Sequence, residues 1–227
     1  LEEVNKADII FVAIPTPFHD DGRGYDDSAV SESVVAIGDG KIVVIKSTVL
    51  PGTTAALQRQ YPKKKILFNP EFLRAKTPFE DFVRPDKQIL GFTEESRSSA
   101  KGVLEMLPRA PYERLIPASE AEMVKYFSNV FLANRVVFAN QIYDLCEKLG
   151  IDYDVVRECV ARDPRIGESH FDVYADGYRG YGGMCLPKDT KALIGLARSR
   201  GLTLLLFETM EEVNRALRDG VPPQSDP

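Results

Sequence analysis

The chain has 227 residues, of which 44% are hydrophobic and 28% are charged, and its formal net charge at pH 7 is −5. These ordinary values exclude a disordered or collagen-like chain, and the acidic balance is unlike that of a dedicated nucleic-acid-binding protein. No apolar run approaches the roughly 18 residues that a membrane helix needs. Three widely spaced cysteines are typical of a reducing compartment. We therefore expect a cytoplasmic globular protein with neither a membrane nor a nucleic-acid partner.

Short apolar runs alternate with helical stretches through the first half of the chain. The runs predict strands at residues 7–14, 41–46, 65–68, 88–92 and 112–116. Helices are predicted between them at residues 27–37, 53–60 and 95–106. The first run is apolar without alternation, as in a parallel sheet that is covered on both faces. This order of elements predicts a doubly wound α/β sheet.

The sequence becomes helical after Pro117. Ser119 and Glu122 have the spacing of a capping box, and Gly150 supplies a stop, so we expect one helix that ends at Leu149. About thirty residues at 1.5 Å each give a rod of roughly 45 Å. Such a length is typical of a domain junction or a dimer interface.

Three further helices complete the predicted organisation, at residues 152–161, 187–200 and 203–218. A loop rich in Gly, Asp and Tyr lies between the first two of them, at residues 163–184. We place an α/β domain at residues 1–118, a helical domain at 119–218 and a tail at 219–227 that its prolines keep from being helical.

Polar residues follow three of the predicted strands, at residues 15–17, 47–48 and 69–71. Ligands of doubly wound sheets bind beyond the carboxyl ends of the strands. A single such ending is more often an ordinary turn, but three in succession predict a common polar rim.

Lys125 and Asn129 are four residues apart and therefore share one face of the long helix. The segment 123–132 is apolar almost all round, which predicts that it is buried. A lysine in such a segment must reach water at a domain edge, a partner or a ligand, because an unpaired buried charge is costly. Together the two side chains offer a cation and an amide donor suited to stabilising an oxyanion.

Cys185 lies in the densest local pattern, residues 180–189, which also holds several glycines. Pro187 fits the first turn of the helix that follows. The helix N-terminus and the nearby Lys188 both favour a thiolate, so Cys185 is the candidate nucleophile. Cys146 and Cys159 have apolar neighbours on predicted helices, and we expect both to be core thiols.

The two histidines do not have the spacing of metal ligands, so no metal site is predicted. His19 begins a stretch, residues 19–22, that favours a solvated loop, with divalent-ion capture as an alternative. A dyad of a cysteine with His170 is a further alternative.

Six of these motifs, in this order and spacing, resemble the UDP-glucose/GDP-mannose dehydrogenase family of nucleotide-sugar dehydrogenases. The matching pieces are residues 14–17 (IPTP), 46–53 (KSTVLPGT), 69–74 (NPEFLR), 119–129 (SEAEMVKYFSN), 163–167 (DPRIG) and 180–189 (GYGGMCLPKD). The resemblance extends over about residues 7 to 215, which is nearly the whole chain.

The resemblance implies a partial Rossmann-like sheet, followed by an all-helical dimerisation domain and therefore a homodimer. It implies NAD as the cofactor and a nucleotide sugar as the substrate. The implied reaction oxidises a sugar C6 alcohol to the carboxylate, as in UDP-glucose to UDP-glucuronate, with two equivalents of NAD. A cysteine thiohemiacetal and then a thioester are the implied intermediates.

Family roles can be carried over to matching positions. The implied catalytic residues are Cys185 as nucleophile, Lys125 and Asn129 as oxyanion donors, Glu71 as acid/base, and Thr48 and Asp189 as holders of the hydrolytic water. The implied NAD contacts are Thr16, Thr48 and Lys188. The implied substrate contacts are Glu71, Phe72, Leu73, Arg74, Ala75, Lys125, Asn129 and Gly182.

The sequence departs from the family at three places. It lacks the G-x-G-x-x-G phosphate loop with its acidic partner, it lacks the third domain, and it has Ala75 where a glutamate often meets the nicotinamide. We therefore expect the middle part of such an enzyme, which should not turn over UDP-glucose by itself. One alternative is a non-catalytic remnant that serves as a helical dimerisation module. Another is a different dehydrogenase, which leaves a cysteine so close to Pro187 unexplained.

Overall fold

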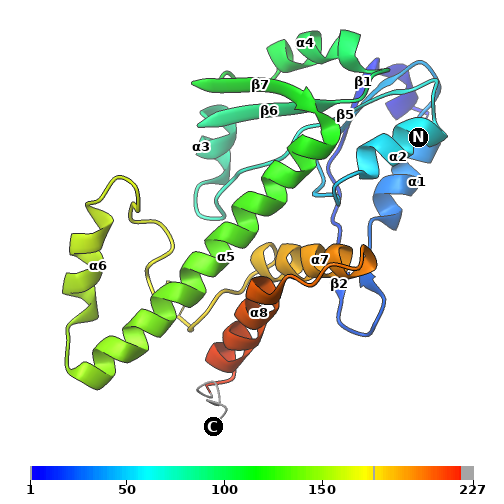
Figure 1. Ribbon diagram of the computed structural model, residues 1–227. Coiled ribbons are helices and arrows are strands. Elements are labelled where there is room, and N and C mark those ends of the chain that lie inside the picture. The colour runs from blue at the N-terminus through cyan, green and yellow to red at the C-terminus, as the bar shows by residue number, and fades with distance from the viewer. Residues whose placement is uncertain (1, 176, 221–227) are drawn as a thin grey trace. The chain divides into compact units, whose positions relative to one another are not determined.

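The computed structural model describes residues 2–175 and 177–220. The packing of the chain divides it into two compact units, Leu1–Tyr126 and Phe127–Pro227. The first unit holds the sheet, and the second is helical (Figure 1). Each unit is described by itself below.

The first unit is built on a five-stranded sheet with the strand order β1-β4-β5-β6-β7. The strands are β1 (Ile9–Val12), β4 (Ile42–Ile45), β5 (Lys65–Phe68), β6 (Lys87–Phe92) and β7 (Tyr112–Pro117). The pairs β1/β4, β4/β5 and β6/β7 are parallel, which confirms the predicted fold class. The pair β5/β6 is antiparallel, with Phe68 opposite Gly91. The connection that contains α3 (Pro78–Val83) therefore leaves and re-enters the sheet at the same end.

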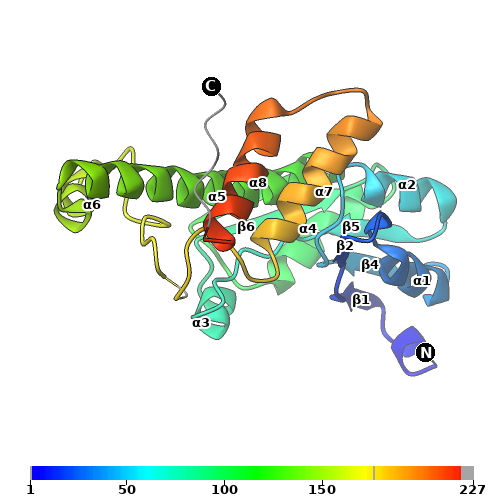
Figure 2. The same cartoon turned by 90° about the horizontal axis from the view of Figure 1, so that it is seen from below.

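Helices cover both faces of this sheet (Figures 1 and 2). The side chains of Val43, Ile45, Ile66 and Phe68 pack with α1 (Ser28–Ala36) and α2 (Thr53–Gln60). The alternate side chains, Val44, Leu67 and Leu90, pack with α4 (Arg97–Met106) on the other face. The central strands are apolar without alternation because both of their faces are buried. The three predicted helices of this region match α1, α2 and α4 to within two residues at each end.

The long helix α5 (Ala118–Leu149) begins in the first unit. Its 32 residues give a length of about 48 Å. The first turn crosses β6 at Gly91, where a Cβ atom would lie 2.8 Å from both Ala118 and Ala121. Only glycine allows so close a crossing, and this fixes the point at which the helix leaves the sheet.

The predicted capping box at the start of α5 is wrong. Ser119 lies inside the helix rather than at its cap. The carboxylate of Glu122 instead accepts hydrogen bonds from the N–H groups of Gly52 (2.6 Å) and Thr54 (2.8 Å) at the start of α2. These N–H groups have no partner within their own helix, so Glu122 caps α2 from a distance.

The second unit contains the rest of α5 together with α6 (Tyr153–Ala161), α7 (Leu186–Ser199) and α8 (Leu205–Arg218). Asp152 caps α6 by accepting the N–H groups of Asp154 and Val155. Tyr153 packs on Cys146 and edge-on against Tyr143 of α5. The helices α7 and α8 lie side by side and are joined by a short turn (Figures 1 and 2).

The structure refines or corrects several local predictions. The predicted solvated loop at residues 19–22 is largely the exposed turn of a small hairpin formed by β2 (Phe18–His19) and β3 (Gly24–Tyr25). Cys159 is exposed on α6, so its assignment to the core is wrong, whereas Cys146 is buried as predicted. The segment 123–132 is buried on one side only. Phe127, on its other side, is 70% exposed. Most of the predicted tail, residues 221–227, lies outside the described residues.

Candidate active site

The polar ends of β1, β4 and β5 meet at one rim of the first unit, as predicted. The hydroxyl of Thr16 donates to the carbonyl of Thr48 at 2.9 Å, and the hydroxyl of Tyr25 donates to the same carbonyl at 2.7 Å. The hydroxyl of Ser47 accepts the N–H of Ile14 at 2.8 Å. Because the three strands are parallel neighbours, their carboxyl ends lie at the same edge. The rim is thus a set of mutually bonded loops.

A buried polar cluster continues this rim. The ammonium of Lys46 donates to Asn69 Oδ1 at 2.7 Å and forms an ion pair with Glu71 Oε2 at 2.8 Å. Asn69 is fully buried, and its amide nitrogen donates to Gln88 Oε1 and to the carbonyl of Ile89. Every polar atom of the Asn69 side chain therefore has a partner, which is what a buried amide requires.

Lys125 reaches the same cluster from α5. Its ammonium donates to the carbonyl oxygen of Glu71 at 2.5 Å and lies 5.6 Å from the centre of the Phe72 ring. Lys87 lies 4.0 Å from the same ring centre, and burial lowers the pKa of Lys87. Of the three alternatives for this lysine, which were water, a partner or a ligand, the structure shows a partner within the chain. The helix thereby presents its cation to the loop that follows β5.

The loop beyond Phe72 is more open. Leu73, Arg74 and Ala75 are all exposed. The guanidinium of Arg74 forms an ion pair with Asp81 of α3, and these hydrogen bonds hold the pKa of Asp81 well below its usual value. Arg74 is thus held along the protein surface by a neighbouring helix.

In the second unit, Asp189 is the centre of the polar contacts. Its carboxylate is buried and accepts hydrogen bonds from Asn129 Nδ2 (2.5 Å) on one oxygen and from Lys188 Nζ (2.6 Å) on the other. A buried carboxylate needs such partners, because its desolvation is otherwise very costly. Three residues predicted for the site are therefore in direct contact.

Cys185 occupies the N-cap position of α7 and is exposed to solvent. The helix is 14 residues long, with Pro187 in its first turn as predicted. Free N–H groups and the positive end of the helix dipole at such a position stabilise negative charge. A sulfur atom here can reach a substrate from solvent while a helix N-terminus stabilises charge that develops on it.

The glycine loop that leads to Cys185 is anchored by asparagine side chains. Asn214 of α8 accepts the N–H of Tyr181 at 2.7 Å and donates to its carbonyl at 3.0 Å. Gly180 has φ +73°, and a Cβ atom there would lie 2.5 Å from Asn214 Oδ1. The hydroxyl of Tyr181 bonds to Glu211, and burial together with this carboxylate raises the pKa of Tyr181. Gly182 is half-buried and packs so closely on Tyr178 that a side chain would collide with the ring.

The predicted site residues thus form two groups, one in each unit. Thr16, Thr48, Glu71 and Lys125 belong to the first, and Asn129, Cys185, Lys188 and Asp189 to the second. Within each group the structure brings most members into contact. Sequence reasoning gave no role to Lys46 or Tyr25 and placed Asn69 only at the predicted rim, although Lys46 is part of one of the motifs. The available signal was its position directly after an apolar strand at the predicted rim.

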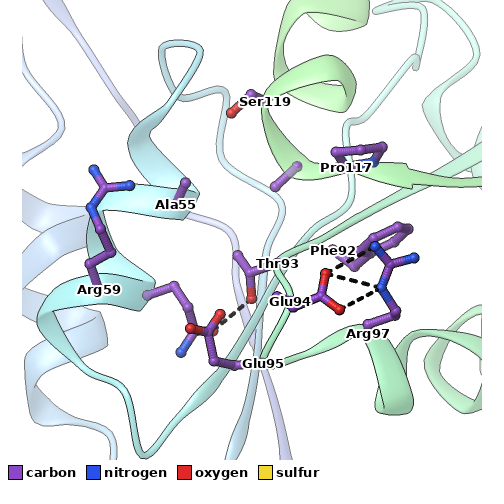
Figure 3. Close-up of a pocket in the computed structure, with 11 residues that line it drawn as sticks. Ala55, Arg59, Phe92, Thr93, Glu94, Glu95, Arg97, Pro117 and Ser119 are labelled. Atoms are coloured by element: carbon purple, nitrogen blue, oxygen red, sulfur yellow. Dashed lines mark hydrogen bonds and ion pairs between the residues drawn. The ribbon is translucent and has the colours of Figure 1, made fainter.

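A separate pocket of about 310 Å³ lies between α2, the turn after β6 and the start of α5 (Figure 3). Arg97 is paired with Glu94 at its edge, and Thr93 donates to Gln58. None of the predicted site residues lines it. The pocket therefore lies apart from the candidate site.

Residues 2–175 and 177–220 contain neither a candidate metal cluster nor a helix that could cross a membrane. No group of three His, Cys, Asp or Glu side chains in this part of the chain is placed to hold a metal ion. His19 instead pairs with Asp26 at 3.3 Å. None of the described helices combines the length and the apolar character that a membrane crossing requires.

The chain is similar to known proteins in sequence and in fold. Residues 1–107 match the NAD binding domain of the UDP-glucose/GDP-mannose dehydrogenase family, and residues 119–216 match its central domain. The UDP-glucose 6-dehydrogenase AglM of Haloferax volcanii is 35% identical over 97% of this chain and 54% of its own length. The UDP-glucose 6-dehydrogenase of Pseudomonas aeruginosa is 36% identical over 94% of this chain and 49% of its own.

A solved UDP-glucose dehydrogenase from Pyrobaculum islandicum superposes with a TM-score of 0.83 and 37% identity, over 94% of this chain and 51% of its own. The chain thus spans about half the length of the relatives that it matches.

Proposed function

Because the chain belongs to the UDP-glucose/GDP-mannose dehydrogenase family, we propose that its protein oxidises the C6 alcohol of a nucleotide sugar to the carboxylate with NAD. One observation carries this proposal. Cys185 is exposed at the N-terminus of α7, and Asn129 and Lys188 of the same unit converge on the buried Asp189. This is a nucleophile beside a prearranged set of polar groups.

The rim of the first unit suits the nicotinamide end of NAD. It lies at the carboxyl ends of parallel strands, where such folds bind nucleotides. The hydroxyl of Thr16 donates to the carbonyl of Thr48, which holds this side chain at the rim. Thr16 and Thr48, with Lys188 of the second unit, would hold the cofactor. NAD would supply the hydride acceptor when bound, and two equivalents in turn would take up the two hydrides that the reaction releases.

The protein's own residues supply the remaining chemistry. The thiolate of Cys185 adds to the aldehyde carbon left by the first oxidation, so that a C–S bond forms and the carbonyl oxygen becomes an alkoxide. Lys125 and Asn129 stabilise this oxyanion. Asn129 donates one amide hydrogen to Asp189, and its second amide hydrogen would be donated to the oxyanion.

Removal of the second hydride leaves a thioester. Water adds to its carbonyl, the C–S bond breaks, and the thiol and the carboxylate are released. Glu71 takes the proton of that water, and Thr48 and Asp189 orient it. The loop from Phe72 to Ala75 and Gly182 would line the sugar.

The proposal is tested with the protein encoded by the whole gene, because the chain spans about half of its relatives. The assay follows NADH formation from NAD and UDP-glucose, with Cys159→Ser as the matched exposed cysteine control. We expect Cys185→Ser to lower kcat by roughly 10³-fold or more, as loss of a nucleophile does. Wild-type turnover in Cys185→Ser would contradict a covalent mechanism.

A second candidate function, a helical dimerisation module, is favoured by one face of α5. Phe127, Phe131, Phe138, Leu145 and Leu149 recur at helical spacing, and each is at least half exposed. A contiguous apolar face of this kind is typical of an association site, and we propose that it forms a homodimer. Light scattering on Phe131→Glu/Phe138→Glu, with Gln141→Glu as the exposed polar control, should show the variant shifted to monomer. A monomeric wild-type protein would contradict this second proposal.

A further inference from the structure

Lys46 is a buried cation with no role in the proposed reaction. It directly follows β4 (Ile42–Ile45), and its side chain is only 16% exposed. Its ammonium contacts two atoms of the loop after β5, namely Asn69 Oδ1 at 2.7 Å and Glu71 Oε2 at 2.8 Å. A lysine held by two short contacts in a nearly closed environment has a fixed ammonium position.

The amide of Asn69 determines where that ammonium lies. Asn69 Nδ2 donates to Gln88 Oε1 at 3.0 Å and to the carbonyl of Ile89 at 2.7 Å. Both are acceptors, so turning the amide round would place an oxygen against two oxygens. Oδ1 must therefore face Lys46. The orientation is set by β6, the strand that runs antiparallel to β5.

Glu71 is thus held at two points by two lysines. Lys46 binds carboxylate oxygen Oε2, and Lys125 binds the backbone carbonyl. Among the described residues, Oε1 of Glu71 has no hydrogen-bond partner, and the side chain is 33% exposed. One carboxylate oxygen is anchored and the other is presented to the open side of the rim.

We propose that Lys46 is the positioning residue of Glu71. It fixes the carboxylate so that Oε1 is available to accept a proton, while Asn69 keeps the lysine in place. The inference rests on the proposed function, in which Glu71 is the acid/base. Lys46 itself touches no reacting atom, and it acts only through the carboxylate.

The contact is tested first in this chain, by heteronuclear NMR of the lysine ammonium groups. Hydrogen-bonded, shielded ammonium groups exchange slowly with water, and loss of the signal in Lys46→Met assigns it. We expect Glu71→Gln to shift the Lys46 signal and to speed its exchange. Lys41, just before the other end of β4 and 3.7 Å from Asp8, is the internal control whose signal stays unchanged. An unchanged Lys46 signal in Glu71→Gln would overturn the pairing.

The role is tested by turnover of the protein encoded by the whole gene. We expect Lys46→Met to lower kcat on the order of 10²-fold, the usual effect of a displaced catalytic group, with a smaller change in KM. Lys46→Arg should recover much of the loss, and Lys41→Met should match the wild type. Lys46→Met/Glu71→Gln should be no slower than Glu71→Gln alone, because Lys46 acts through Glu71. Circular dichroism checks that each variant is folded.

The outcomes separate the two proposals. If Glu71→Gln is slow but Lys46→Met has normal kcat, or only a raised KM, the positioning role of Lys46 is wrong and the proposed function stands. If Glu71→Gln retains wild-type kcat, the acid/base role of Glu71 fails, and the role of Lys46 fails with it. A double variant much slower than Glu71→Gln would show that Lys46 acts on something other than Glu71.

Discussion

The rim of the first unit and the glycine loop of the second, which ends at Cys185 and is called the cysteine loop below (residues 180–185), place polar groups by different means. At the rim, Asn69, Lys46 and Thr16 are held by strands and by buried hydrogen bonds. The cysteine loop has little regular structure and is fastened by the side chains of Asn214 and Asn140, while Cys185 remains exposed. The polar groups of the rim are fixed by the sheet, whereas the proposed nucleophile is exposed, where a substrate could approach it.

Among the predictions that test this comparison, Lys125→Ala is expected to have the largest effect, which is on kcat. Lys125 is the cation that α5 presents to the rim, through the carbonyl of Glu71. An oxyanion donor acts mainly in the transition state, so we expect kcat of the whole-gene protein to fall on the order of 10²–10³-fold with little change in KM. Lys148→Ala, in the last turn of the same helix, is the control. A normal kcat with a raised KM would make Lys125 a simple binding residue.

Glu122→Gln probes how firmly α5 is attached to the start of α2. Its carboxylate accepts the N–H groups of Gly52 and Thr54, whereas an amide offers one oxygen and a donor group to the same pair. We expect a loss of about 1–3 kcal/mol in the free energy of unfolding, measured by denaturant titration. The exposed Glu120→Gln is the matched control. Equal stability of the two variants would mean that this contact does not hold the helix.

The carboxyl group of Glu122 also makes the free energy of unfolding depend on pH. Burial raises the pKa of Glu122 in the folded protein above its ordinary value of 4.5. A raised folded-state pKa stabilises the fold below the unfolded value, and this contribution is lost as pH rises through the folded value. We therefore expect the stability difference between wild type and Glu122→Gln to decline as pH rises above 4.5. A difference that increases with pH would reverse the assigned sign.

Sequence reasoning succeeded where one physical constraint dominates. The runs at Val43–Ile45 and Ile66–Phe68 are apolar because both faces of the sheet are covered, and that topology alone brings Thr16, Thr48 and Glu71 to one edge. The N-terminal position of Cys185 followed from Pro187 in the same way. These features require no knowledge of distant contacts.

Sequence reasoning failed where the partner of a side chain comes from a distant segment of the chain. Glu122 has the spacing of a local cap, but the free N–H groups of α2 take its carboxylate. The part played by Lys46 depends on the orientation of Asn69, which Gln88 sets from another strand. Cys159 has apolar neighbours in sequence, but Val155 and Val160 beside it are exposed as well. Local composition did not reveal which side of α6 faces the core.

Thiol labelling gives the smallest effect but tests the cysteine loop directly. Cys185 and Cys159 are both exposed, so accessibility alone predicts similar rates of alkylation. Only Cys185 stands at a helix N-terminus, whose N–H groups and dipole stabilise the negative charge of the attacking sulfur. Cys159 lies within α6, and Cys146 is buried.

We expect iodoacetamide to label Cys185 several-fold faster than Cys159, and Cys146 last, as measured by peptide mapping of the folded chain. Labelling in denaturant should bring the three rates together, because the difference comes from the fold. If Cys159 reacts faster than Cys185 in the folded protein, the helix terminus does not activate the sulfur, and the assignment of Cys185 as the nucleophile is wrong.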